Sequence, residues 1–315
     1  MAKFFSEKDV NQLLTMDEAI KSLEEAFIAS SKKKIINIPR NRIDIEGSNF
    51  NFMAASWEEK EIVGYKSYVA GSKGLSFHVC IYSLKDNRLL AIIEANRLGQ
   101  LRTGAATGIA TKFLCQKDSI SMGVFGSGFQ AETQIEAISN VKKITECIVY
   151  SRNLERSQQF CQKMSEKLKI PVNSTSDPEQ CAVNKDVIVT ITNSQEPVLK
   201  GKWLSPNTHI NAAGSNVANR REIDIEAIER SDLIVVDDMN QAKIECGDLI
   251  QYKKIDSTFD WSNVCLLGDL VAKKKKIPEN TITLFESQGI ALEDIAIAHT
   301  LLKKSIKEDR GIYLN

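Results

Sequence analysis

The pattern of apolar and polar positions along the chain changes near residue 118. Before that point, apolar residues mostly recur at every second position, which is the spacing of a half-buried β-strand. This spacing predicts strands over 36–45, 49–54, 61–69, 75–84 and 89–94. Short polar turns such as Asp86-Asn87 separate these runs, so we expect hairpin-connected antiparallel strands in the first region.

Helical spacing occurs at both ends of this strand-rich region. Ser6 and Asp9 have the form of a capping box at a helix start, with Asp in place of the usual Glu or Gln. An amphipathic helix is predicted over 17–31. A further helix is predicted over 97–114, where small residues at helical spacing indicate close packing against its neighbours.

From Ile120 onward, strand-like apolar runs alternate with helical segments. The runs predict strands over 120–125, 146–151, 186–192, 208–213, 232–237 and 281–285. The segments between them predict helices over 130–139, 153–168 and 223–229, and a closing helix follows over 294–306. Because such alternation is typical of parallel strands covered by helices, we expect an α/β fold here.

A glycine-rich turn joins the first of these strands to its helix. Gly126 suits the backbone angles of a tight turn, and Gly128 lacks the Cβ that would keep a pyrophosphate from the helix amides. Ala131 stands where a third small residue packs helix on strand. The next strand ends at Tyr150, about 25 residues further on, near the distance expected for contact with an adenosine ribose. An ordinary turn is the alternative, but this context favours a dinucleotide site.

The residues that follow Tyr150 bear on the choice of dinucleotide. An acidic residue at this place accepts hydrogen bonds from the ribose and repels a 2′-phosphate. Here the sequence is Ser151-Arg152-Asn153, which offers hydrogen-bond donors and a guanidinium suited to phosphate. NADP(H) is therefore favoured and NAD(H) remains possible, while a solvated arginine after a strand is the alternative interpretation.

Composition narrows the class of protein. The 315 residues suit two domains, and 41 basic and 41 acidic side chains leave no net charge. We therefore expect no general attraction to nucleic acid or to an anionic membrane. Seven cysteines, mostly in apolar runs, predict reduced thiols, and no apolar run approaches the roughly 20 residues of a membrane span. A cytoplasmic protein is expected.

Several cations lie in or beside apolar or small-residue segments of the first region. They are Arg40 (or Arg42, on the same face of a regular strand), Lys66 and Arg102. A converging group of this kind suits an α-carboxylate, because arginine binds it in bidentate geometry and lysine supplies a point charge. Surface cations with buried stems are the alternative. The histidines, His78, His209 and His299, have no partner at ligand spacing, so we expect no metal.

Several motifs in one order resemble the ornithine cyclodeaminase/mu-crystallin family over almost the whole chain. The matching stretches are Gly64-Tyr65-Lys66, residues 101–108, residues 126–131, residues 209–215, residues 221–224 and residues 285–294. The resemblance implies NAD(P)-dependent oxidoreductase chemistry on amines and imines. It also implies a homodimer, a discontinuous α+β substrate-binding and dimerisation domain over 1–117 and 292–315, and a Rossmann-type parallel-sheet domain over 118–291.

The same resemblance implies roles for individual residues. Arg40, Lys66 and Arg102 would bind the substrate carboxylate, with Lys66 also close to the reacting nitrogen. A partly desolvated lysine exchanges protons near neutral pH when its pKa is lowered. Together with the glycine turn and the residues after Tyr150, the resemblance gives a predicted cofactor site of Arg102, Thr103, Gly126, Gly128, Phe129, Gln130, Ser151, Arg152, Asn153, Thr192, Ala213, Gly214, Arg220 and Ser287.

Two positions depart from the family pattern. Asn216 stands where the cyclodeaminases and the archaeal alanine dehydrogenase have an aspartate, and Phe77 stands where the family has a threonine. An amide is no general acid or base, but Asn216 retains hydrogen bonding to a substrate nitrogen or to the nicotinamide amide. Reduction of a preformed cyclic imine needs only a bound carboxylate, a protonated C=N bond and a hydride donor.

The leading hypothesis is thus an NADPH-dependent reductase of small cyclic α-imino acids, such as Δ1-pyrroline-2-carboxylate or Δ1-piperideine-2-carboxylate. Its catalytic residues would be Lys66 and Asn216. An amino-acid dehydrogenase of the alanine dehydrogenase type and an ornithine cyclodeaminase are the enzymatic alternatives. An NADPH-dependent small-ligand-binding protein without turnover is the alternative of another class.

Overall fold

The computed structural model describes residues 1–72, 74–273 and 277–314. Its contacts divide the chain into two compact units, which we call the first unit and the second unit. The first unit comprises Met1–Arg102 and Gly289–Asn315, and the second comprises Thr103–Gln288. Helix α3 (Asn96–Leu114) carries the chain from the first unit into the second. The roles predicted for the two domains stay predictions.

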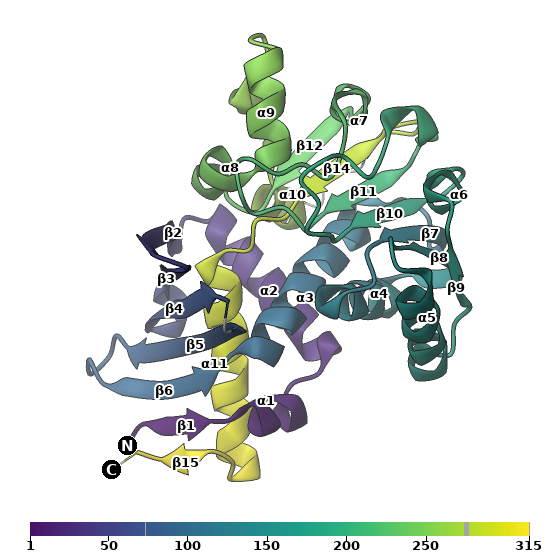
Figure 1. Cartoon of the computed structure of the whole chain (residues 1–315). Helices are drawn as coiled ribbons and strands as arrows, with labels where there is room; N and C mark the ends of the chain where they lie inside the picture. Colours follow the sequence, from purple (N-terminus) through teal and green to yellow (C-terminus); the bar gives the residue numbers. More distant parts are fainter. Residues whose placement is uncertain (73, 274–276, 315) are drawn as a thin grey trace. The chain divides into compact units, whose positions relative to one another are not determined.

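The first unit is built on a mixed sheet whose order, in the described chain, is β15-β1-β6-β5-β4-β3-β2 (Figure 1). Its strands are β1 (Lys3–Phe5), β2 (Ile35–Ile45), β3 (Ser48–Trp57), β4 (Ile62–Gly71), β5 (Gly74–Ser83), β6 (Leu89–Glu94) and β15 (Ile312–Tyr313). Strands β2 to β6 pair antiparallel, as their spacing predicts. The short strand β1 pairs parallel to β6 and antiparallel to β15, and neither pairing was expected.

Helices cover one face of this sheet. They are α1 (Glu7–Leu13), α2 (Met16–Ser31), the start of α3 and α11 (Ala291–Glu308), with the 3₁₀ turn η1 (Glu58–Lys60) between strands. Ser6 and Asp9 form the predicted capping box. Helix α11 packs on β3, β4 and β5. Gly64 permits this close approach, because a Cβ there would lie 2.6 Å from Ile295 Cδ1.

A β-bulge in β2 turns arginines toward the covered face of the sheet. Ile38 pairs with Ala54 and Asn41 pairs with Phe52, so two residues of β2 oppose Met53 alone. The extra residue reverses the alternation, and Arg40 is buried although Ile38, two residues earlier, is exposed. The strand is therefore not regular at this point, and its irregularity is what buries Arg40.

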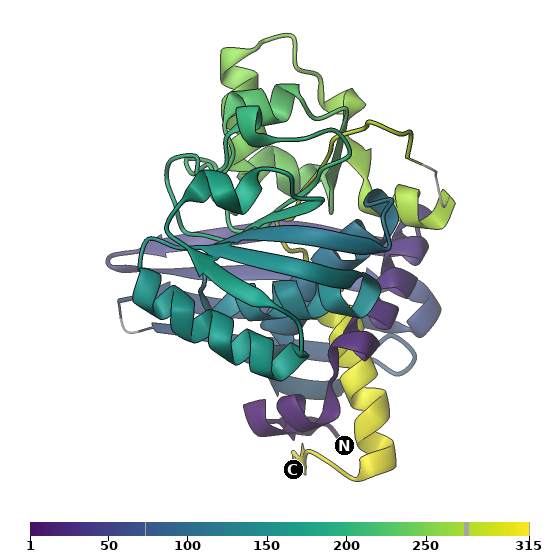
Figure 2. The same cartoon turned by 90° about the vertical axis from the view of Figure 1, so that its right-hand side faces the viewer.

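The second unit is a parallel sheet in the order β13-β12-β14-β11-β10-β7-β8-β9 within the described residues. Figure 1 labels most of these strands, and Figure 2 gives a second view of them. Its strands are β7 (Ser119–Phe125), β8 (Lys143–Tyr150), β9 (Val172–Thr175), β10 (Val187–Thr190), β11 (His209–Ala212), β12 (Leu233–Val236), β13 (Cys265–Leu266) and β14 (Thr283–Glu286). Its helices are α4 (Phe129–Val141), α5 (Leu154–Leu168), α6 (Pro178–Ala182), α7 (Ile225–Glu229), α8 (Met239–Glu245), α9 (Gly247–Ile255) and α10 (Leu267–Lys273), with the 3₁₀ turns η2 (Gly201–Trp203) and η3 (Trp261–Asn263). The predicted α/β fold with a Rossmann-type parallel sheet is confirmed.

The strand order of the second unit reverses between β7 and β10. From β7 the chain continues to β8 and β9 on one side, and then returns to β10, β11 and β14 on the other. Ligands of such sheets bind outside the carboxyl ends of the strands at this reversal. The fold therefore directs attention to the residues that follow β7, β10, β11 and β14.

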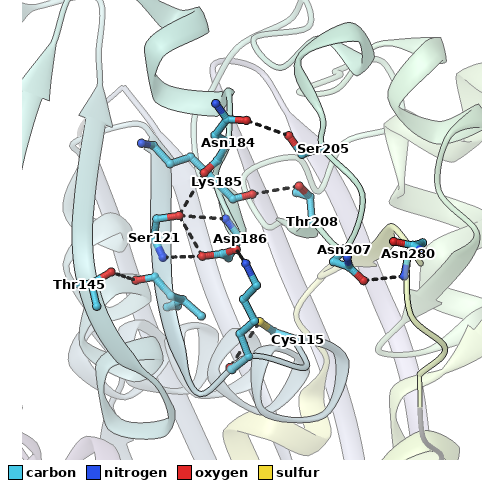
Figure 3. Close-up of polar contacts among 12 residues, drawn as sticks. Cys115, Ser121, Thr145, Asn184, Lys185, Asp186, Ser205, Asn207, Thr208 and Asn280 are labelled. Carbon is cyan, nitrogen blue, oxygen red and sulfur yellow. Dashed lines mark hydrogen bonds and ion pairs between the residues drawn. The ribbon is translucent and has the colours of Figure 1, made fainter.

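The amino ends of the same strands carry a structural polar cluster (Figure 3). Asp186 Oδ2 accepts hydrogen bonds from Ser121 N at 2.8 Å and from Ser121 Oγ at 3.0 Å. Thr208 Oγ1 donates to the carbonyl of Lys185 at 2.9 Å. These bonds join β7, β10 and β11 before the strands enter the core.

Two further findings concern cysteines and membranes. All seven cysteines are free thiols, and six of them are buried while Cys265 is partly exposed. Burial raises the pKa of thiols such as Cys181, to about 12, so they remain protonated. Among the described helices, none combines the length and the apolar character that crossing a membrane requires.

Candidate functional site

Lys66 is the centre of a buried charge cluster in the first unit. Its side chain comes from β4, is 3% exposed, and donates a hydrogen bond from Nζ to Asp294 Oδ1 at 2.9 Å. Asp294 lies in the first turn of α11 and is fully buried. Gly99 of α3 gives the ammonium room, because a Cβ there would lie 3.2 Å from Lys66 Nζ.

Two arginines join this cluster. Arg102 donates from Nη1 to Glu293 Oε2 at 3.0 Å, and its Nε lies 3.4 Å from Asp294 Oδ1. Arg40 donates from Nη2 to the carbonyl of Gly289 at 3.0 Å. Gly289 has φ +72°, and a Cβ there would overlap the guanidinium of Arg102. A glycine is thus required where the chain passes between the two guanidinium groups.

The cluster gathers three cationic and two acidic side chains. Arg40, Lys66 and Arg102 lie in it with Glu293 and Asp294. The pKa of Lys66 is lowered to about 8, chiefly by burial. The negative charge of Asp294 raises this pKa, whereas the positive charges of Arg102 and Arg40 contribute to its lowering. Guanidinium and ammonium groups are the side chains that bind carboxylates in proteins, so the arrangement suits an anion of that kind.

A pair of packed aromatic rings lies beside the ammonium of Lys66. Lys66 Nζ lies 5.1 Å from the centroid of the Phe77 ring, within the range of a cation–π interaction. Phe77 in turn packs on Tyr68 with ring centroids 4.7 Å apart. The phenylalanine that departs from the family pattern therefore places an apolar ring beside the ammonium. Arg42, the alternative to Arg40, is exposed and donates from Nε to Asn51 Oδ1 at 3.1 Å.

The glycine turn of the second unit has the geometry expected of a phosphate-binding loop. Gly126 has φ +115°, and its amide donates to the carbonyl of Tyr150 at 2.8 Å. Gly128 is the N-cap of α4, and nothing in the described chain lies within 4 Å of where its Cβ would be. No described side chain caps this helix, and the N-terminus of a helix attracts an anion through its dipole. Phe129 beside them is 62% exposed.

The three predicted residues after β8 differ in their contacts. Asn153 is the N-cap of α5, and its side chain accepts a hydrogen bond from Arg156 N at 2.9 Å. Arg152 is exposed, and its Nη2 lies 3.5 Å from Asn193 Oδ1, a long contact that leaves the guanidinium weakly held. Ser151 is partly buried at the strand end.

The ends of β10, β11 and β14 hold most of the other predicted cofactor residues. The hydroxyl of Thr192 donates to Glu222 Oε1 at 2.6 Å, so this side chain is engaged within the protein. Gly214 has no room for a Cβ beside the main chain of Thr192. Ala213 donates its amide to the carbonyl of Thr190 at 2.9 Å.

Unpaired buried polar atoms mark the same edge of the sheet. Ser287 is 4% exposed, and its hydroxyl has no hydrogen-bond partner among the described residues. Gln130 Oε1 at the start of α4 is likewise buried and without a partner in the described chain. Because buried polar groups normally have partners, these atoms fit a ligand that offers an amide and hydroxyls, as a dinucleotide does.

The remaining predicted residues also lie in the second unit, but none of these described residues carries a buried polar atom of this kind. Thr103 is buried in α3. Asn216 lies half-buried in the loop that follows β11. Arg220 accepts a hydrogen bond on its carbonyl from Ser215 Oγ at 3.1 Å, and its own side chain is partly buried.

Sequence reasoning missed the carboxylates that surround these groups. Glu293 and Asp294 were quoted only as part of a family motif, and Glu222 likewise, with no role given to any of them. A signal was present, because two adjacent acidic residues open an otherwise apolar helix with the pattern of a buried one. Acidic residues are almost never fully buried unless they are paired, so each buried carboxylate implies a partner cation or donor.

The side chain of His209 takes part in hydrogen bonds within the core of the second unit. His209 is fully buried, with Nδ1 2.8 Å from Thr283 Oγ1 and Nε2 3.1 Å from Asn211 Oδ1. Burial lowers its pKa to about 3, so the ring is neutral. In the described part of the chain, no group of three or more His, Cys, Asp or Glu side chains is arranged to hold a metal ion.

Known proteins resemble this chain over its whole length. The sequence model of the ornithine cyclodeaminase/mu-crystallin family matches residues 2–309. An alanine dehydrogenase from Archaeoglobus fulgidus is 30% identical and covers 97% of this chain and 96% of its own length.

Solved structures are similar as well. Thermococcus litoralis Δ1-pyrroline-2-carboxylate reductase in complex with NADH and L-proline gives a TM-score of 0.93 at 30% identity, over 99% of this chain and 100% of that one. An archaeal alanine dehydrogenase dimer with bound NAD gives a TM-score of 0.93 at 28% identity, over 100% of this chain and 99% of that one.

Proposed function

Because the chain belongs to the ornithine cyclodeaminase/mu-crystallin family, we propose that it is an NAD(P)H-dependent reductase of small cyclic α-imino acids. Substrates of the Δ1-pyrroline-2-carboxylate or Δ1-piperideine-2-carboxylate type would be reduced at C=N. Support comes from the similarity to a Δ1-pyrroline-2-carboxylate reductase solved with NADH and L-proline. The observation that carries the proposal is the buried cationic cluster of Arg40, Lys66 and Arg102.

The cluster supplies what the reaction requires from the protein. The substrate carboxylate would bind to Arg40 and Arg102, which bring two guanidinium groups to the two sides of Gly289. Lys66, with a pKa of about 8, holds a proton at neutral pH and can release it to a nearby imine nitrogen. The reduced nicotinamide would supply the hydride. Asn216 would hydrogen-bond the substrate nitrogen or the nicotinamide amide.

The cofactor would bind to the second unit. The glycine turn and the N-terminus of α4 suit a pyrophosphate, and the unpaired atoms of Ser287 and Gln130 suit the rest of the dinucleotide. We infer a preference for NADP(H), because Arg152 is exposed and weakly held, and the turn after β8 has no carboxylate to repel a 2′-phosphate. NAD(H) remains possible, since the two similar structures carry NADH or NAD.

The test of the function is direct. Purified protein is mixed with each cyclic imine and with NADH or NADPH, and nucleotide oxidation is followed by absorbance. We expect oxidation that depends on the imine, with lower KM for NADPH than for NADH. Absence of oxidation with both imines would contradict the substrate class, and an Arg152→Ala variant with unchanged preference would contradict the cofactor assignment.

An amino-acid dehydrogenase is the second candidate, favoured by the 30% identity to an alanine dehydrogenase. It would need ammonia together with a keto acid such as pyruvate, whereas the imine reductase would not. An ornithine cyclodeaminase is less consistent with Asn216. A binding protein without turnover would bind NADPH tightly and oxidise it with none of these substrates.

We also infer a homodimer that forms through the open face of the sheet in the first unit. Exposed apolar side chains share that face: Ile36, Ile38 and Ile43 of β2, Phe52 of β3, and Tyr65 and Val69 of β4. Apolar patches of this kind mark interfaces, and a two-fold axis would bury the same patch on both copies. The similar archaeal alanine dehydrogenase is a dimer.

Light scattering after size-exclusion chromatography tests the assembly. We expect a dimer for the unchanged chain and a monomer for the double variant Ile38→Glu with Val69→Glu. Ile306→Glu is the control, because Ile306 is exposed on α11 outside this face.

A cytoplasmic location is proposed from the seven free thiols, which would persist in a reducing compartment.

A further inference from the structure

One buried carboxylate of the second unit collects four hydrogen bonds from two strand ends. Glu222 is fully buried, and its Oε1 accepts from Thr192 N at 2.6 Å and from Thr192 Oγ1 at 2.6 Å. Its Oε2 accepts from Gly214 N at 2.7 Å and from Thr190 Oγ1 at 3.0 Å. Each carboxylate oxygen therefore serves two donors.

The chemistry of these partners requires two acceptor oxygens. Main-chain amides only donate, and one amide points at each oxygen of Glu222. An amide side chain at this position would turn its NH₂ group toward one of these N–H groups and leave that donor unsatisfied. Burial raises the pKa of Glu222, while the hydrogen bonds of Thr192, Gly214 and Thr190 oppose that shift.

The four donors belong to neighbouring strands. Thr190 ends β10 and Thr192 follows it, while Gly214 follows β11, the adjacent parallel strand. A Cβ at Gly214 would lie 2.6 Å from Glu222 Oε1, so main chain and carboxylate are in close contact. Glu222 therefore sets the spacing and the direction of both strand ends.

These strand ends lie on one particular side of the strand-order reversal. The Gly126-x-Gly128 turn follows β7, whereas β10 and β11 belong to the opposite half of the sheet. In a doubly wound fold of this kind, each half holds one mononucleotide of the dinucleotide. The adenosine half is assigned to β7 and β8, so the half beyond β10 remains for the nicotinamide mononucleotide.

We propose that Glu222 is a positioning residue for the nicotinamide mononucleotide half of the cofactor site. It would act through the main chain after β10 and β11, without touching the cofactor itself. The inference rests on the proposed dinucleotide site and extends it by a residue that holds only one half of that site in place.

The test compares two ligands that differ by the nicotinamide half. NADH carries both mononucleotides, whereas ADP carries only the adenosine and the two phosphates, and neither has a 2′-phosphate. Dissociation constants of both are measured by calorimetry for the full chain and for Glu222→Gln, with thermal unfolding recorded alongside. We expect Glu222→Gln to weaken NADH about tenfold or more, because one buried amide loses its acceptor. ADP should bind within about twofold of the unchanged chain, because its contacts do not involve these strand ends.

Two further variants make the comparison sharper. Thr190→Val removes one of the four donors and keeps the volume, so NADH should weaken about threefold. Asp248→Asn is the matched control: Asp248 is a buried carboxyl whose Oδ1 accepts from Glu222 N at 2.9 Å and Ile223 N at 3.0 Å. Its Oδ2 has no partner in the described chain, so asparagine keeps the acceptor in use. We expect binding of both ligands to this variant within about twofold of the unchanged chain.

The outcomes separate this inference from the function on which it rests. Equal weakening of NADH and ADP by Glu222→Gln, or weakening of neither, would overturn the positioning role and leave the dinucleotide site intact. Failure of the unchanged chain to bind either ligand would overturn the dinucleotide site, and the inference with it. If Glu222→Gln does not fold, Thr190→Val decides, and an unchanged ratio of the two dissociation constants overturns the proposal.

Discussion

The two units hold buried charge in opposite ways. In the first unit, Lys66 and Arg102 pair with Asp294 and Glu293, so each buried carboxylate faces a cation. In the second unit, the carboxylate of Glu222 accepts hydrogen bonds from neutral amides and hydroxyls. The first arrangement pairs opposite charges and includes a titratable ammonium. The second fixes main-chain atoms.

This difference indicates different tasks. A cluster of two guanidinium groups and an ammonium suits an anion, and burial brings the pKa of its lysine to a value where proton transfer is feasible. A carboxylate that accepts hydrogen bonds only from neutral donors has its orientation fixed by those donors. It supplies no proton to a reaction. Changes in the first unit should therefore alter chemistry and its pH dependence, and changes in the second unit should alter binding geometry.

The largest effect is expected from removal of the ammonium in the first unit. Lys66→Met keeps the length of the side chain and removes its proton, so the rate of imine reduction should fall about 10³-fold. Asp294 keeps a partner, because Arg102 Nε lies 3.4 Å from it. Steady-state kinetics measures the loss. The dissociation constant of NADH should stay within about twofold, and a loss of turnover below about tenfold would contradict the proton-donor role.

A smaller loss is expected when the arginines are pushed apart. Gly289 has φ +72°, and a Cβ there meets the guanidinium of Arg102, so Gly289→Ala should displace that side chain. Because Arg102 would bind the substrate carboxylate, KM for the imine should rise about 30-fold, with a smaller change in kcat.

A second glycine is the control for this variant. Gly47 also has positive φ, at +73°, but no described atom lies within 4 Å of where its Cβ would be. Gly47→Ala should therefore strain the backbone in the same way and leave KM unchanged. Equal effects of the two substitutions would show that the backbone strain, and not Arg102, is responsible.

The contrast between the units also explains which parts of the fold were predictable. Local spacing predicted most strands of both sheets, because alternation and helical period are properties of neighbouring residues. It missed β1 and β15, since Lys3 pairs with Tyr313 at the other end of the chain and each strand is very short. It also missed β9, whose residues Val172–Thr175 carry little alternation, and β13, which has only two residues.

The residues of the site also divide into those that the local sequence predicts and those that depend on tertiary contacts. Cations in apolar segments, together with the family motifs, identified Arg40, Lys66 and Arg102. Their partners Glu293 and Asp294 lie about 190 residues or more further along the chain, and pairing at that distance is a tertiary property. The bulge that buries Arg40 was missed as well, because a one-residue insertion does not alter the alternation of either flank by itself.

A more moderate effect is expected from pH. With a pKa of about 8, Lys66 loses its proton as pH rises, so kcat/KM for imine reduction should fall about tenfold per unit above that value. In the reverse oxidation of the cyclic amino acid, Lys66 must be unprotonated to accept the proton, so the rate should rise toward the same pH and then level. Both profiles are measured between pH 6 and about 10. A reduction rate that stays constant up to pH 9.5 would contradict the assignment of Lys66 as the acid.

The smallest effect on binding is expected at the opposite end of the second sheet. Asp186 also accepts from neutral donors, Ser121 N and Oγ, but it has Lys117 as a cationic partner and joins strands away from the predicted cofactor edge. Asp186→Ala should lower the free energy of unfolding by about 1–2 kcal/mol, because Ser121 N loses its acceptor.

Burial raises the pKa of Asp186, but hydrogen bonds from Lys117 and Ser121 outweigh this and hold it below its usual 3.8. Its stabilisation is therefore present above pH 3.8 and lost as pH falls through the lowered value. Chemical denaturation at neutral pH measures the loss, and the NADH dissociation constant should not change, because a carboxylate at the amino end of the strands does not set their carboxyl ends. A variant that loses NADH binding as strongly as Glu222→Gln would remove the distinction between the two ends of the sheet.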